Sequence, residues 1–436
     1  MSNDTQSSAS PPAPVRAEPP GPTRKTLLTN TLYAFGGTAG TAISQALASM
    51  LLLVLLSKFH YGVLTSAVAW IDPVRRLSVF GLDAIGLQRA ARDPERAPKV
   101  VSTLVLLRAG ISAACFMAVV VLAPTLRADA PGGPFALIAA ALVLLPASVS
   151  APLQVAFQAR HQNKRLLGLP IFSGIAQVLV LGALYLADAT VVYYIAAIST
   201  TELVNAVLIG VMLRGEQGGV FHGFDGRLAR SMLVEAAPLA YSYVVVMLYK
   251  RLGFYFVEAQ HGVESVGALG AAVQLSAPAV GLGGALSVSI GPYAAQLAAK
   301  GELATLRKEA VRATSKVLAY LTPITLLMAF LAIPATARWA PEYADAARAF
   351  GWMSTAGLFM FVARTTTAIL VALRRARVMS YVVTVDLVVF TLFAWALVPS
   401  YSAEGAAMAT FLMEGLNVVV QCGLVYTYTR TPQPTP

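Results

Sequence analysis

Apolar runs close to 20 residues long recur along the whole chain, and they constrain the fold more than any other feature. A run of about 20 apolar residues is what an α-helix needs to cross the hydrocarbon core of a bilayer. The composition agrees, since 57% of the residues are hydrophobic, only 12% are charged, and the mean hydropathy is +0.68. One water-soluble core cannot hide that much apolar surface, so the sequence predicts an all-α integral membrane protein.

Twelve of these runs are predicted to be transmembrane helices, six on each side of a charged break. They lie at residues 28–57, 62–82, 99–123, 135–158, 167–187, 190–213, 231–256, 265–292, 313–334, 347–373, 378–398 and 405–428. The first 26 residues hold six prolines and no apolar stretch, which predicts a disordered tail. In chain order we expect this tail, an N-terminal six-helix lobe, a linker, a C-terminal six-helix lobe and a short tail, at residues 1–26, 27–213, 214–230, 231–428 and 429–436.

Lysine and arginine collect in alternate loops, which fixes the predicted orientation. The two tails and the loops that follow even-numbered spans hold 22 of them, whereas the opposite loops hold four. Short cytoplasmic loops of membrane proteins carry the basic excess. We therefore expect a multi-pass protein of a bacterial inner membrane with both termini cytoplasmic. The net charge of +11 then reflects topology and attraction to anionic lipid, and no motif indicates nucleic-acid binding.

A short internal repeat relates the two halves. Residues 62–77 read GVLTSAVAWIDPVRRL and residues 267–282 read GALGAAVQLSAPAVGL, with six identities in sixteen positions at a shift of 205. The shift pairs the second predicted span with the eighth, which runs in the same direction. Parallel repeats of this kind are typical of transporters whose pathway lies between two lobes.

Five short motifs, in order along the predicted spans, carry a family resemblance. They are Tyr61-Gly62, FGLDAIGLQRAARDP at residues 80–94, Glu264-Ser265-Val266-Gly267, Ile290-Gly291-Pro292-Tyr293, and PEYADA at residues 341–346. In these motifs the chain resembles the polysaccharide flippases of the multidrug, oligosaccharidyl-lipid and polysaccharide exporter superfamily, which also contains the MATE drug exporters. The resemblance implies a V-shaped, MATE-like fold of two bundles that alternates access, and a lipid-linked sugar as cargo. The family often carries an acidic residue late in span seven, where this sequence reads YKRLG at residues 249–253.

Six basic residues lie more than one turn inside the predicted spans, where a charge is costly unless it pairs or faces water. They are Arg75, Arg76, Arg108, Lys250, Arg251 and Arg364. The planar guanidinium group matches the oxygens of a diphosphate, so these residues are candidate substrate-binding groups for a polyprenyl diphosphate in a water-filled cleft between the lobes. The four that fall at similar depth, all except Lys250 and Arg251, are predicted to form one cationic collar.

Five acidic residues also lie inside the predicted spans: Asp72, Glu202, Glu235, Asp386 and Glu414. They have two possible roles, as structural partners of the basic residues or as coupling sites for a proton or a sodium ion. Asp72 lies three and four residues before Arg75 and Arg76, which is the spacing of helical ion pairs. Glu202 and Glu414 occupy equivalent positions near the midplane at a shift of 212. The sequence leaves both roles open.

The favoured function is translocation of a lipid-linked oligosaccharide in O-antigen, capsule or exopolysaccharide biosynthesis. The first alternative is a cation-coupled multidrug exporter of the MATE type. A membrane polysaccharide polymerase or glycosyltransferase is a second alternative, although such enzymes present a sizeable extracytoplasmic loop and no predicted loop exceeds about 17 residues. No GxxxxGK[ST] phosphate-binding loop occurs, which argues against an ATP-driven pump.

Neither a cofactor nor a metal is expected, because the four histidines show no metal-ligand spacing. The expected partners are the lipid-linked oligosaccharide itself, membrane lipids and other polysaccharide-assembly proteins. We expect no enzymatic activity, because the predicted work is transport and not bond-making.

Overall fold

Every regular element in the described part of the chain is a helix. The computed structural model describes residues 24–430, apart from residues 94, 161, 215–222, 340 and 374. The elements are α1 (Arg24–Leu55), α2 (Lys58–Val79), α3 (Leu82–Arg92), α4 (Ala97–Leu126), α5 (Gly133–Ala141), α6 (Leu144–Ala159), η1 (Asn163–Leu166), α7 (Leu169–Leu186), α8 (Val191–Ala197), α9 (Thr200–Arg214), α10 (Gly226–Ala299), α11 (Leu303–Trp339), η2 (Pro341–Tyr343), α12 (Ala344–Ala372) and α13 (Ala376–Arg430). The all-α prediction is confirmed for these residues.

The helices have the length and the surface that a bilayer requires. Among the described residues, eight helices are long and apolar enough to cross a membrane. Large apolar side chains lie on the outer surfaces of the helices, and the exposed fractions of Val54 on α1 and Leu186 on α7 reach 82% and 87%. Such a surface is unfavourable in water and favourable against lipid tails. The chain is a multi-pass membrane protein.

Several predicted spans are joined or divided differently in the structure. α10 and α13 each contain two predicted spans and are interrupted at one residue with positive φ, Gly262 at 77° and Ser402 at 52°. Conversely, the predicted spans 135–158 and 190–213 are divided, the first into α5 and α6 and the second into α8 and α9. One residue of unusual φ is enough to end a helix and start the next, so hydropathy alone does not show where a span ends.

The predicted first tail and linker are shorter than expected. α1 already begins at Arg24, and α10 begins at Gly226, inside the predicted linker 214–230. Asp225 explains the second start, because its Oδ1 accepts hydrogen bonds from the backbone N–H groups of Arg227 and Leu228 at 3.1 Å each. This is the helix-capping role that aspartate favours. The rest of the predicted tails and most of the linker lie outside the described residues.

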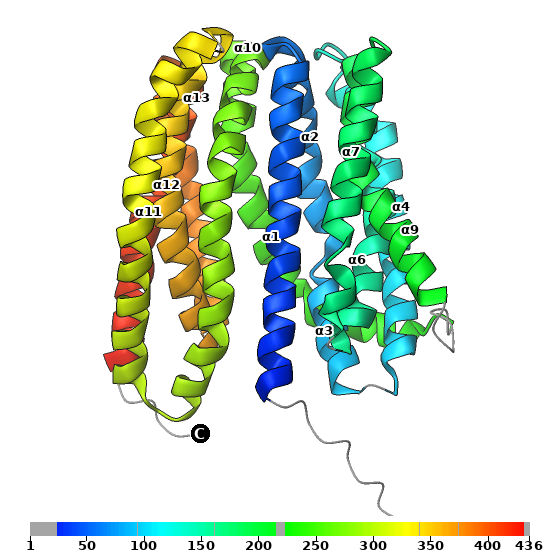
Figure 1. Cartoon of the computed structure of the whole chain (residues 1–436), viewed down its shortest axis with the longest axis vertical. Coiled ribbons are helices and arrows are strands. Elements are labelled where there is room, and N and C mark those ends of the chain that lie inside the picture. The colour runs from blue at the N-terminus through cyan, green and yellow to red at the C-terminus, as the bar shows by residue number, and fades with distance from the viewer. Residues whose placement is uncertain are drawn as a thin grey trace, which may run out of the picture.

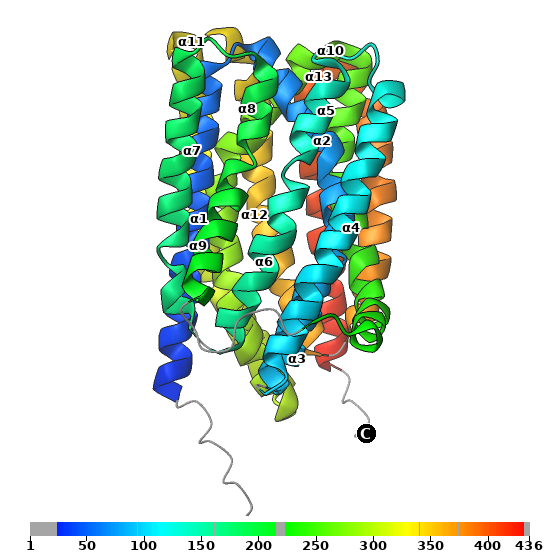
Figure 2. The same cartoon turned by 90° about the vertical axis from the view of Figure 1, so that its right-hand side faces the viewer.

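Two groups of helices stand side by side, α1–α9 in one and α10–α13 in the other (Figure 1). After a quarter turn the helices of both groups still run along the same long axis (Figure 2). α1 stands between the groups and contacts both α7 and α10. α1 begins and α13 ends at the same end of the bundle, which we call the terminal end. The opposite end, where α1 leads into α2, is called the distal end.

α2 and α10 cross near the distal end at very close range. A Cβ atom added at Gly62 would lie 2.0 Å from the carbonyl oxygen of Val263, and one added at Gly267 would lie 2.5 Å from that of Lys58. Only glycine lets two helix backbones approach so closely. The main hydrophobic core surrounds this crossing and combines buried residues of α2, α5 and α8 with residues of α10 and α13.

Candidate functional site

α2 places charged side chains where the two helix groups meet. Asp72 accepts a hydrogen bond from Nη2 of Arg251 on α10, across the boundary between the groups. Arg75 is directed instead to α9, where its Nη2 donates to Oε1 of Glu202 at 2.9 Å. The predicted pairing of Asp72 with Arg75 and Arg76 along α2 is therefore wrong. Asp72 has a partner on α10 because the two helices cross, and pairing offsets the cost of withdrawing this half-buried carboxylate from water.

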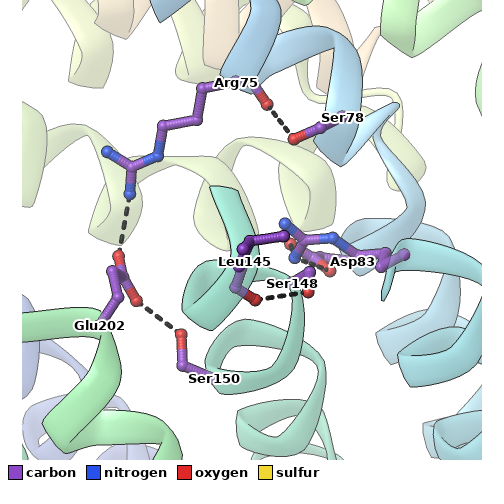
Figure 3. A network of polar contacts seen from close by, with 8 residues as sticks. Arg75, Ser78, Asp83, Leu145, Ser148, Ser150 and Glu202 are labelled. Carbon is purple, nitrogen blue, oxygen red and sulfur yellow. Dashed lines mark hydrogen bonds and ion pairs between the residues drawn. The ribbon is translucent and has the colours of Figure 1, made fainter. Parts of the chain in front are cut away.

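Glu202 is satisfied on both of its carboxylate oxygens (Figure 3). Oε1 accepts from Arg75, and Oε2 accepts from Oγ of Ser150 on α6 at 2.5 Å. The three residues tie α2, α6 and α9 together. For Glu202 this geometry favours structural pairing over ion coupling.

Arg108 does not join the predicted collar. Its Nη1 donates to both carboxylate oxygens of Asp83 on α3, each at 2.8 Å, and the residue is only 1% exposed. Asp83 belongs to the motif at residues 80–94 but was not among the predicted site residues. A buried guanidinium that is held by a carboxylate joins α4 to α3 and presents no charge to an anion. The prediction of a collar is wrong at Arg108.

Three of the six basic candidates form no hydrogen bond or ion pair with any residue that the structure describes. They are Arg76 on α2, Lys250 on α10 and Arg364 on α12, and all three are exposed. Lys250 interacts electrostatically with both Arg76 and Arg364, so its charge lies near one arginine of each helix group. We call the three residues the free-cation cluster. Like charges at short range repel, and an anion between them would turn that repulsion into attraction.

Two acidic side chains of α13 lie beside this cluster. Asp386 and Glu414 are 7% and 3% exposed, interact electrostatically with each other, and form no ion pair with the described residues. Glu414 accepts a hydrogen bond from Asn417, and its charge interacts with those of Lys250 and Arg364. Both predicted roles, pairing and ion coupling, stay open for these two carboxylates.

Glu235 lies near the start of α10 and away from the cluster. Its Oε2 accepts a hydrogen bond from Nη2 of Arg89 on α3 at 2.6 Å, and Nη1 of Arg89 donates to Ser231 at 2.7 Å. Of the two roles that the sequence leaves open for Glu235, this geometry favours structural pairing. The partner is an arginine at the end of α3, because the first turns of α10 pack on the terminal end of the first group.

A second network, centred on Glu258 of α10, joins the groups nearer the distal end. Glu258 accepts hydrogen bonds from Ser66 at 2.8 Å and from the indole of Trp70 at 3.3 Å, and it pairs with Nη1 of Arg127 at 2.7 Å. Arg127 also donates to Ser66 at 2.9 Å, and its guanidinium lies 5.7 Å from the centre of the Trp70 ring. We call these four residues the distal network. They hold α2 and the end of α4 against α10.

Sequence reasoning missed the distal network for an identifiable reason. The third and seventh predicted spans end at residues 123 and 256, which places Arg127 and Glu258 in loops. The helical segment in fact continues to the break at Gly262. Glu258 lies about two turns after Lys250 and beyond the YKRLG stretch at residues 249–253, where the sequence departs from the family pattern. Extending the helix to the next glycine would have found Glu258.

Solved structures with the same arrangement of helices are MATE transporters and their relatives. An inward-facing multidrug resistance MATE family transporter of the MOP superfamily matches with a TM-score of 0.63 and 14% identity, covering 93% of this chain and 96% of that chain. A MOP superfamily transporter from Pyrococcus furiosus matches with a TM-score of 0.63 and 14% identity, covering 93% and 97%. The Vibrio cholerae MATE transporter VcmN matches with a TM-score of 0.65 and 14% identity, covering 93% and 97%. A search of curated proteins found no match.

The chain has the MATE-like fold seen in these solved transporters of the MOP superfamily. A family model described as polysaccharide biosynthesis protein matches residues 27–298, which is more than half of the chain. The chain therefore belongs to the polysaccharide biosynthesis protein family. The family resemblance and the MATE-like fold that the motifs implied are confirmed.

Proposed function

We propose that this protein translocates a lipid-linked oligosaccharide, carried on a polyprenyl diphosphate, across a bacterial inner membrane by alternating access. The step would serve O-antigen, capsule or exopolysaccharide biosynthesis. The free-cation cluster is the observation that carries this proposal. Its three side chains are accessible and unpaired within the described residues, whereas Arg75, Arg108 and Arg251 nearby are each held by a carboxylate. The family and the transporter fold support it.

A diphosphate suits this cluster for two reasons. Hydrogen bonds between charged groups are roughly twice as strong as those between neutral groups, and two guanidinium forks with one ammonium offer donors for several phosphate oxygens. The headgroup would therefore exchange its hydration for fixed cationic donors while the lipid tail stays in the bilayer. Because Arg76 belongs to one helix group and Lys250 and Arg364 to the other, the bound headgroup would contact both lobes.

In a cycle of alternating access, the contacts that join α2 to α10 are those that must break for the lobes to separate at the distal end. The distal network, the pair of Asp72 and Arg251, and the crossing at Gly62 all join α2 to α10. We assign the cytoplasmic side to the terminal end, because the excess of basic loop residues lies there. In this assignment, separating α2 from α10 at the distal end releases cargo to the periplasm.

Asp386 and Glu414 are our candidates for the coupling site. A proton or a sodium ion bound between two neighbouring buried carboxylates offsets their mutual repulsion. Glu414 interacts electrostatically with Lys250 and Arg364 of the free-cation cluster, and Asp386 interacts with Glu414. Ion binding there would change the potential felt by a bound diphosphate, which couples the two sites.

A cation-coupled multidrug exporter of the MATE type is the second candidate. The two buried carboxylates and the fold favour it. A cationic drug would need accessible acidic or aromatic groups, whereas the accessible charges at the lobe boundary are basic. We propose no catalytic role and no cofactor.

Transport in proteoliposomes separates the two candidates. The probe is a fluorescent polyprenyl diphosphate oligosaccharide, and a membrane-impermeant quencher reports its arrival in the opposite leaflet. Native protein is expected to move the lipid, and Arg76→Gln and Arg364→Gln are expected to slow this by roughly tenfold to a hundredfold, the effect of losing a hydrogen bond to a charged group. Lys308→Gln, at an exposed lysine of α11, is the matched control. If native protein moves no lipid but expels a cationic dye down an ion gradient, the second candidate is correct.

A further inference from the structure

A cavity of about 410 Å³ lies within the first helix group, and the proposed function does not use it. Its walls come from α1, α3, α6, η1, α7 and α9. The volume falls within the roughly 300–1,000 Å³ typical of small-molecule pockets. A cavity of this size inside a membrane protein needs an occupant that suits its lining.

The lining is polar but carries almost no charge. Ten of its fifteen described residues have a hydroxyl or a carboxamide, and none of the fifteen is Asp, Glu, Lys, Arg or His. Hydroxyl and carboxamide groups both donate and accept hydrogen bonds. The hydroxyl and acetamido groups of a neutral sugar have the same dual character. A phosphate would require cationic donors and a cationic drug would require a carboxylate, so neither suits this lining.

Asn205 on α9 shows that the cavity has unused hydrogen-bonding capacity. Its Oδ1 atom is buried and accepts no hydrogen bond from the described residues. An amide oxygen withdrawn from water is costly unless a donor replaces the lost hydrogen bond. A hydroxyl group of a bound ligand would supply that donor.

The cavity adjoins the charged site through two shared helices. On α9, Thr201 lines the cavity and is followed by Glu202, the partner of Arg75. On α6, Gln154 lines the cavity one turn after Ser150, which donates to Glu202. One wall is α1, which also contacts α10 of the other lobe. The cavity thus lies within one turn of the partner of Arg75, and Arg75 is followed on α2 by Arg76 of the free-cation cluster.

We propose that this cavity binds a neutral sugar residue of the lipid-linked oligosaccharide while the free-cation cluster binds its diphosphate. The inference rests on the proposed function and specifies it further, because it assigns recognition of the glycan to uncharged side chains of the first lobe. Specificity for the sugar then resides in Gln154, Gln158 and Asn205, whose carboxamides line the cavity from α6 and α9.

Equilibrium binding to the purified full-length protein tests this division. The two probes are a fluorescent polyprenyl diphosphate carrying one hexose and the same lipid without a sugar. The double variant Gln154→Ala with Asn205→Ala should bind the hexose-bearing lipid about tenfold more weakly, since each lost hydrogen bond contributes roughly twofold to tenfold. It should bind the sugar-free lipid as native protein does. Arg76→Gln should weaken both probes.

Ser148→Ala is the matched control, because Ser148 lies on α6 outside the cavity and its hydroxyl donates to the Leu145 carbonyl of the same helix at 2.6 Å. It should change neither affinity. If the double variant melts at a lower temperature than native protein, the single variant Gln158→Ala decides by the same comparison. Unchanged binding of the hexose-bearing lipid by a folded cavity variant would overturn the inference and leave the diphosphate site intact. If native protein binds neither probe, the proposed function fails and the inference fails with it.

Discussion

Gly62 of α2 and Gly267 of α10 pack backbone against backbone where the two helices cross. A Cβ atom at Gly267 would lie 3.2 Å from the amide nitrogen of Gly62 and 3.3 Å from its Cα. The internal repeat aligns these same two positions at a shift of 205. Two equivalent residues that contact each other lie close to the axis that relates their repeats. The crossing of α2 and α10 therefore marks the axis between the lobes.

Gly62→Ala is expected to destabilise the fold by about 1–3 kcal/mol, the usual effect of overpacking. Its methyl group would lie 2.0 Å from a backbone carbonyl oxygen that cannot move independently. Thermal unfolding of the purified protein measures the effect. Gly182→Ala is the control, because no atom lies within 4 Å of its added Cβ and alanine favours helix over glycine. Equal melting temperatures for the two variants would contradict the close crossing.

The pair of Asp72 and Arg251 is expected to behave as one energetic unit. In a double-mutant cycle with Asp72→Asn and Arg251→Gln, the coupling energy should be about 0.5–3 kcal/mol, because each single variant leaves the partner charge unpaired. The same cycle with Asp72→Asn and Arg76→Gln should give a smaller coupling energy, because these two side chains interact electrostatically but form no ion pair. Denaturant unfolding supplies the free energies. A larger coupling with Arg76 would restore the local pairing along α2.

The sequence predicts the helices and the ionisable residues inside them, but it does not predict which of these residues form ion pairs with one another. Apolar runs reveal the spans, because a segment in lipid must form its backbone hydrogen bonds within itself and therefore folds as a helix. The ion pairs, however, join Asp72 to Arg251 and Arg75 to Glu202, which are 179 and 127 residues apart. Such pairs form because α2 crosses α10 and faces α9, and no local spacing encodes that. For the same reason the sequence identifies the six basic candidates but does not show which of them lack a partner.

Glu258→Gln is expected to loosen the contact between α2 and α10, because it removes the charge that holds Arg127. Breaking a buried pair is worth about 3–5 kcal/mol. Separation of α2 from α10 can be followed with the variant Ala69→Cys, made in a protein whose own cysteines are removed by Cys115→Ala and Cys422→Ala. Ala69 is fully buried, and its carbonyl oxygen accepts a hydrogen bond from Tyr255 of α10, so the new thiol becomes accessible only when the helices separate. Maleimide labelling should accelerate by roughly tenfold or more.

The control for that measurement is Glu264→Gln, at an exposed carboxylate of the same helix. It should leave the labelling rate at Ala69→Cys unchanged. An equal acceleration by both glutamate variants would show that loss of any acidic group near the distal end has this effect, and that the distal network is not a specific latch.

The start of α10 is expected to respond to acid through Asp225. The hydrogen bond from Lys99, with those from the backbone of Leu228 and Arg227, holds the pKa of Asp225 below its ordinary value of 3.8. Because the folded-state pKa is lowered, the ionised form stabilises this helix start above pH 3.8, and the stabilisation is lost as the pH falls through the lowered pKa. Hydrogen exchange at the Leu228 amide, normalised for its intrinsic rate, should show that loss. Lys99→Ala should move the midpoint of this loss to higher pH. An unchanged midpoint would contradict the assignment of the lowered pKa to the hydrogen bond from Lys99.

The most direct test of the central claim is the affinity of the protein for a sugar-free polyprenyl diphosphate. The triple variant Arg76→Gln, Lys250→Gln and Arg364→Gln removes the free-cation cluster, and Lys308→Gln removes one exposed charge elsewhere. If the cluster holds the diphosphate, the triple variant should bind it at least roughly a hundredfold more weakly, because several charge-assisted hydrogen bonds are lost together. Lys308→Gln should bind it as native protein does. Native affinity in a folded triple variant would contradict the claim that these three cations form the substrate site.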